Sequence, residues 1–77
     1  MTMYEACALA STEATLASLK HPPMSSHHEA YAVIKEEFDE YWLEVIKGGS
    51  TPRDPEALKL ELVQTAAMCL RALYDLC

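Results

Sequence analysis

The chain has 77 residues, is 51% hydrophobic, and contains only two glycines and four prolines. This composition is too apolar for a disordered segment and predicts a single folded domain spanning residues 1–77. A chain this short buries only about 60% of the surface that its unfolded form exposes, so its core is marginal and self-association is expected.

Twelve Asp and Glu against six Lys and Arg give a formal net charge of −6. No block of basic residues could follow a phosphate backbone, so a long nucleic acid is not an expected partner. An acidic protein can still bind a nucleotide when a divalent cation lies between its carboxylates and the phosphates.

No apolar run approaches the roughly 20 residues that a membrane-spanning helix needs, and the first residues lack the basic region of a signal peptide. We therefore expect a cytoplasmic protein that has no membrane partner. The three cysteines, Cys7, Cys69 and Cys77, lie far apart and outside any C-x-x-C spacing. They indicate neither a disulfide framework nor a zinc site, and we expect them to be small buried apolar residues.

All four prolines and both glycines fall in two stretches, 20–26 and 48–55, which are predicted to be loops. A helix-start pattern follows each loop. Ser26 with Glu29 matches a capping box, and Asp54 before Pro55 fits a helix cap with proline at the first helical position.

Thr2 with Glu5 repeats the capping-box spacing at the amino end. The three starts predict helices at roughly 3–20, 27–47 and 55–76, and no segment alternates for long with the period of a strand. The predicted fold class is all-α, a three-helix antiparallel unit that completes a helical bundle through oligomerisation.

Acidic residues follow one edge of the apolar stripe on the second predicted helix. At about 100° per residue, Glu37, Glu40 and Glu44 border that stripe and do not lie opposite it. Glu37 and Glu40 are neighbours at i and i+3, and their like charges repel unless a cation neutralises them. The stripe, expected to face the core, consists of Tyr31, Ile34, Phe38, Tyr41, Trp42 and Val45.

The third predicted helix is apolar around most of its circumference, which indicates a central helix or one between subunits. Four of its polar residues share one narrow strip: Glu61, Gln64, Arg71 and Asp75. If the second and third helices pack antiparallel, Glu37 and Glu40 face Glu61 and Gln64. Such an all-oxygen set suits Mg²⁺ or Mn²⁺.

The segment "HEAYAVIKEEFDEYW", followed after a loop by "ELVQTAAMCLRALYDL", resembles the MazG-like nucleotide pyrophosphohydrolases of the all-α NTP pyrophosphatase superfamily. The mark of that family is E-E-x-x-E on one helix and E-x-x-D on the next. Glu36, Glu37 and Glu40 match the first part, and Glu61 opens the second. The resemblance covers roughly residues 18–77, and Gln64 stands where the family has Asp.

The resemblance implies a magnesium-dependent enzyme that hydrolyses nucleoside triphosphates to monophosphate and pyrophosphate, as a dimer or tetramer. Glu37, Glu40 and Glu61 would be metal ligands, and Glu36 would position or activate the attacking water. Gln64 can offer an amide oxygen, but it carries no charge and cannot act as a base. The alternative is therefore a non-catalytic helical interaction or nucleotide-sensing module that has kept the fold but lost the activity.

Three further polar residues are candidates for substrate binding: Arg71, Lys35 and Asp75. The guanidinium of Arg71 suits phosphate oxygens, although Arg71 can instead pair with Asp75 at i+4. Lys35 either reaches the phosphates or remains solvated.

Overall fold

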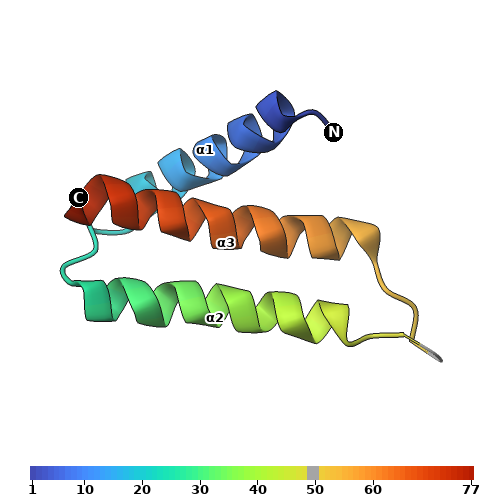
Figure 1. The fold of residues 1–77 in the computed structure, drawn as a ribbon. Helices are drawn as coiled ribbons and strands as arrows, with labels where there is room; N and C mark the ends of the chain where they lie inside the picture. Colours follow the sequence, from blue (N-terminus) through green and yellow to red (C-terminus); the bar gives the residue numbers. More distant parts are fainter. Residues whose placement is uncertain (49–50) are drawn as a thin grey trace.

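The computed structural model describes residues 1–48 and 51–77 and contains three helices. They are α1 (Met3–Lys20), α2 (His27–Val45) and α3 (Pro55–Leu76). α2 and α3 run antiparallel, and α1 crosses the opposite side of α3 at an angle (Figure 1). The all-α prediction is confirmed, and the predicted bounds of α1 and α3 match the observed ones.

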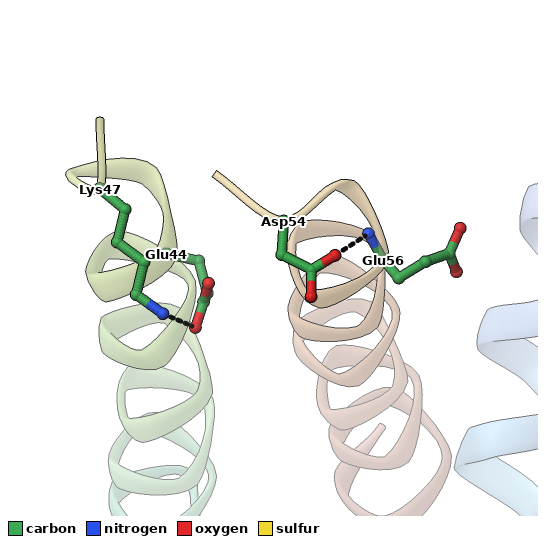
Figure 2. Close-up of polar contacts among 4 residues, drawn as sticks. All are labelled: Glu44, Lys47, Asp54 and Glu56. Carbon is green, nitrogen blue, oxygen red and sulfur yellow. Dashed lines mark hydrogen bonds and ion pairs between the residues drawn. The ribbon is translucent and has the colours of Figure 1, made fainter. Parts of the chain in front are cut away.

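The predicted cap residues begin each helix. Thr2 and Glu5 form a complete capping box, in which each side chain accepts the other residue's backbone N–H at 3.0 and 2.9 Å. Asp54 accepts the N–H of Glu56 at 3.0 Å at the start of α3 (Figure 2). These bonds satisfy amides that have no partner within the helix, which explains why the helices start at these residues.

Two details of α2 differ from the predictions. Ser26 caps the helix as expected, but the Glu29 carboxylate accepts from the backbone N–H and hydroxyl of Ser25, so the capping box is only half formed. The helix ends at Val45, two residues earlier than predicted. At this end Arg53 Nε donates to the Val45 carbonyl at 2.8 Å and satisfies one of the last carbonyls of the helix.

α3 is the central helix. It packs against both α1 and α2, whereas no Cα of α1 comes within 8 Å of a Cα of α2. This confirms the central position that was one of the two alternatives for this helix. The three helices form a thin layer, with principal extents of 42 × 28 × 19 Å.

The core is built mainly from small side chains. Ala67 is fully buried on α3, and no large side chain in residues 1–48 and 51–77 is completely buried. Small residues let the helix backbones approach closely, and two methionines fill the irregular space between them. The core cluster consists of Ala14, Met24, Ala30, Ala67 and Met68.

The prediction that the apolar stripe of α2 faces the core is only half right. Tyr31, Phe38 and Trp42 are 69%, 58% and 59% exposed. The expectation of buried cysteines is wrong, because Cys7, Cys69 and Cys77 are all exposed. A three-helix layer offers α2 a single neighbour, so the half of its apolar surface that points away from α3 stays uncovered. In the described part of the chain, no helix is long and apolar enough to cross a membrane.

Candidate metal centre

Carboxylates of α2 and α3 converge where the two helices pack. Glu37 and Glu40 on α2 and Glu61 on α3 each offer one oxygen, and these oxygens lie within 4.8 Å of one another. Antiparallel packing causes this proximity by placing the middle of α2 beside the first half of α3. We call these residues the acidic triad. The predicted proximity is confirmed.

The acidic triad is partly buried, and this perturbs its ionisation. Burial, followed by the charges of Glu40 and Glu61, raises the pKa of Glu37 to about 7. Burial and then Glu40 also raise the pKa of Glu61. Holding several carboxylates in a partly dehydrated space disfavours their charged forms, and a bound cation would reverse that effect.

Two of these carboxylates have an oxygen with no partner in the described part of the chain. Glu37 Oε2 and Glu61 Oε2 are inaccessible to solvent and accept no hydrogen bond from residues 1–48 or 51–77. Buried carboxylate oxygens normally have hydrogen-bond or metal partners. An all-oxygen group of this kind fits a hard divalent cation such as Mg²⁺ or Mn²⁺.

Glu44 is a fourth acid where α2 packs against α3, and it was not predicted as a site residue. Its Oε1 accepts from Lys47 Nζ at 2.9 Å (Figure 2), and its Oε2 is buried without a partner among the described residues. Its charge contributes to the raised pKa of Glu61. The spacing of four residues after Glu40, along the edge of the apolar stripe, is the sequence signal that could have identified it.

Gln64 lies one turn after Glu61 and lines the same pocket as Glu37. The pocket has a volume of about 460 Å³ and lies between the three helices and the loop before α2. Gln64 is therefore beside the triad, toward its Glu37 end.

Two further predicted site residues, Glu36 and Lys35, lie on the exposed surface of α2. Glu36 is exposed on α2 beside Glu37. Lys35 is also exposed, and its Nζ pairs with Asp39 at 2.7 Å. This ion pair holds Lys35 on the solvent side of α2.

Arg71 and Asp75 do not form the pair that was considered as an alternative. Arg71 is 5% exposed, and its Nη2 donates to the Pro22 carbonyl at 3.0 Å. Asp75 Oδ2 accepts the N–H of Met24 at 2.9 Å. Both side chains turn to the loop before α2, because its backbone groups would otherwise be buried without partners.

Comparisons with models of protein families, with curated proteins and with solved structures found no match. The fold is that of a small all-α three-helix protein, and the MazG-like resemblance rests on the motif residues alone.

Proposed function

We propose that this chain is a divalent-metal-dependent enzyme that hydrolyses nucleoside triphosphates to monophosphate and pyrophosphate. The observation that carries the proposal is the acidic triad, whose buried carboxylate oxygens lack partners in the described structure. Three of the four acidic residues that match the MazG-like motif, Glu37, Glu40 and Glu61, are the residues that converge. Agreement between motif and geometry supports this activity over a solvated acidic surface.

Glu37, Glu40 and Glu61 would hold Mg²⁺ or Mn²⁺, with the amide oxygen of Gln64 as a further neutral donor. When bound, the ion supplies neutralisation of phosphate charge and Lewis-acid activation of water. Glu36, exposed beside the triad, is the candidate for orienting the attacking water and accepting its proton. Catalysis would depend mainly on positioning and on charge stabilisation.

The second candidate is a non-catalytic nucleotide sensor or helical interaction module. Gln64 favours it, because an amide in place of the motif Asp removes one negative charge from the ligand set. Under this alternative, the triad binds a cation weakly or not at all and no triphosphate is turned over.

Self-association is part of the proposal. Large apolar side chains remain exposed on both α2 and α3, among them Phe38, Trp42, Leu62 and Leu73. A second copy that covers these side chains would complete the bundle and enlarge a marginal core. A dimer or tetramer is the expected form.

The test of the activity is release of pyrophosphate from a panel of triphosphates with Mg²⁺ or Mn²⁺. We expect metal-dependent turnover by the intact chain and its loss in Glu40→Gln and Glu61→Gln. Glu56→Gln is the matched control, because Glu56 is an exposed acid on α3 outside the triad. No turnover on any triphosphate, together with no saturable Mn²⁺ binding by calorimetry, would reject the enzyme in favour of the interaction module.

A further inference from the structure

Exposed apolar side chains on α2 and α3 repeat the same spacing along the two helices. On each helix they are separated by seven and then by four residues, which places them on one side of the helix at the spacing with which helices pack in bundles. All of them are exposed, and we call them the apolar face. The apolar face consists of Tyr31, Phe38 and Trp42 on α2 and of Leu62, Cys69 and Leu73 on α3.

The contact between α2 and α3 shows that both parts of the apolar face lie on the same side of the molecule. Glu37 and Glu61 point toward the facing helix, where their carboxylates converge. Met68, seven residues after Glu61, is buried in the same contact. At about 100° per residue, Phe38 and Leu62 each lie about 100° further round their own helix than the converging acid before them. Because the two helices are antiparallel (Figure 1), these equal rotations bring both side chains to the same side of the helix pair.

The acidic triad opens on the opposite side of the helix pair. Glu40 and Gln64 each follow one of the converging acids by three residues, which places them about 60° round in the opposite sense. Gln64 lines the pocket beside the triad together with Glu29. The formal net charge of −6 opposes the association of two copies. This repulsion is smallest when the carboxylates of both copies point away from the interface, as they do when the uncharged apolar face forms it.

The apolar face has the area that a second copy requires. Tyr31, Phe38 and Trp42 are more than half exposed. At about 150 to 250 Å² for each aromatic side chain, these three alone leave roughly 300 to 450 Å² of surface in solvent. Leu62 and Leu73 extend this area, which is already large for a monomer. A polar rim can supply the rest of the about 800 Å² that each partner of a stable dimer buries.

We propose that a second copy of this chain packs on the apolar face, with its α2 against α3 of the first copy and its α3 against α2, and that both acidic triads face outward. The four helices then share one core, in which every helix is antiparallel to its neighbours. α1 stays outside this core, because it crosses the other side of α3 (Figure 1). The inference rests on the self-association in the proposed function, but its test needs neither a metal nor a triphosphate.

The heights of the side chains along the helix pair decide which of them meet. The Glu37 and Glu61 carboxylates converge, and nearer the other end of α3 the Met24 N–H donates to Asp75. Counted in opposite directions from these contacts, Tyr31 on α2 is about level with Cys69 on α3. A two-fold axis parallel to the helices preserves height, so Tyr31 of one copy lies against Cys69 of the second copy.

The first experiment compares how fast two cysteines of the intact, reduced chain react with iodoacetamide in dilute and in concentrated protein. Cys69 belongs to the apolar face, whereas Cys7 is an exposed cysteine on α1. Sedimentation equilibrium gives the associated fraction, and mass spectrometry after trypsin digestion reports each cysteine separately. When about nine-tenths of the chain is associated, Cys69 should react about tenfold more slowly, because only the dissociated fraction is reactive. The reaction rate of Cys7 should not change.

Neighbouring residues of α3 provide matched variants. Leu73 belongs to the apolar face, whereas Tyr74 lines the groove between α1 and α3. Both side chains are exposed, so glutamate at either position should leave the chain folded, which circular dichroism checks. Leu73→Glu places a charge in the interface twice and should weaken association at least about hundredfold, whereas Tyr74→Glu should change it less than about twofold. In Tyr31→Cys, oxidised glutathione should produce a disulfide between position 31 of one copy and Cys69 of the other.

Several results would overturn the inference. A monomer at every concentration, with Cys69 always reactive, would leave the apolar face to another partner. Slower reaction of Cys7 in place of Cys69, or equal effects of Leu73→Glu and Tyr74→Glu, would move the interface to α1. A disulfide mainly between two copies of Cys69 would contradict the packing of α2 against α3.

Mn²⁺ calorimetry separates this inference from the proposed activity. Leu73→Glu should bind Mn²⁺ as tightly as the parent chain, because the acidic triad faces away from the interface. Loss of Mn²⁺ binding in this variant alone would contradict the outward-facing triads. A parent chain that protects Cys69 on association but binds no Mn²⁺ would reject the metal-dependent activity and keep the interface.

Discussion

Replacing Glu37 by Gln removes one carboxylate from the acidic triad and keeps the shape of the side chain. The pKa of Glu37 lies at about 7, above its ordinary value of 4.5, chiefly because of burial and then because of Glu40 and Glu61. A carboxyl whose pKa is higher in the folded state stabilises the fold while it is protonated. That contribution is complete below about pH 4.5 and is lost as the pH rises through about 7.

The size of the effect follows from the pKa difference. At 1.36 kcal/mol per pKa unit, the full difference corresponds to about 3 kcal/mol. Glu37 is only partly buried, so screening by solvent reduces this to about 1 kcal/mol. In a domain of this size, about 1 kcal/mol changes the melting temperature by roughly 5 °C.

The assay is thermal unfolding followed by circular dichroism at pH 8 and pH 4, with a chelator present. We expect Glu37→Gln to melt about 5 °C higher than the parent chain at pH 8 and at the same temperature at pH 4. The matched control, Glu36→Gln, removes an exposed charge from the adjacent position and should change the melting temperature much less. The reasoning would be refuted if Glu37→Gln did not raise the melting temperature at pH 8, or if Glu36→Gln raised it equally.

The parent chain and the Glu37→Gln variant also report on the metal. Mn²⁺ should raise the melting temperature of the parent chain at pH 8, because a ligand that binds only the folded state stabilises it. It should have little effect on Glu37→Gln, or on the parent chain at pH 5, where Glu37 is protonated. An equal rise in all samples would place the ion outside the triad.

Further substitutions test the fold and the assembly. Asp54→Ala should destabilise the fold by about 1 kcal/mol through loss of the α3 cap, and Asp54→Ser should restore most of it in a urea titration. Ala67→Leu should cost about 1 to 3 kcal/mol by overpacking the fully buried position between the helices, whereas the exposed control Ala66→Leu should be nearly neutral. Sedimentation equilibrium should give a dimer or tetramer, which the double substitution of Phe38 and Trp42 by Glu converts to a monomer. A parent chain that sediments as a monomer at all concentrations would contradict the expected interface.

The residues of the acidic triad could be predicted from the sequence, because helical spacing and the length of a loop are both read along the chain. Glu37, Glu40 and Glu61 border apolar stripes at helical spacing, and a short loop between antiparallel helices brings such borders together. Glu44 follows the same helical spacing and could have been identified from it, although it was not predicted as a site residue. The roles of Arg71 and Asp75 were not foreseeable, because both contact the loop before α2 through backbone groups of Pro22 and Met24.

The sequence by itself determined the helices, because caps and loop residues act within a few positions along the chain. Thr2, Ser26 and Asp54 fixed the three starts, and the prolines and glycines marked the breaks. Only the tertiary structure decided which apolar surface is covered. Periodicity defines a face of a helix but not its neighbour, and α2 has one neighbour, which leaves Phe38 and Trp42 exposed. The depth at which the triad lies, and hence the raised pKa of Glu37, likewise depends on how closely α3 packs against α2, and the small residues between the helices set that distance only after folding.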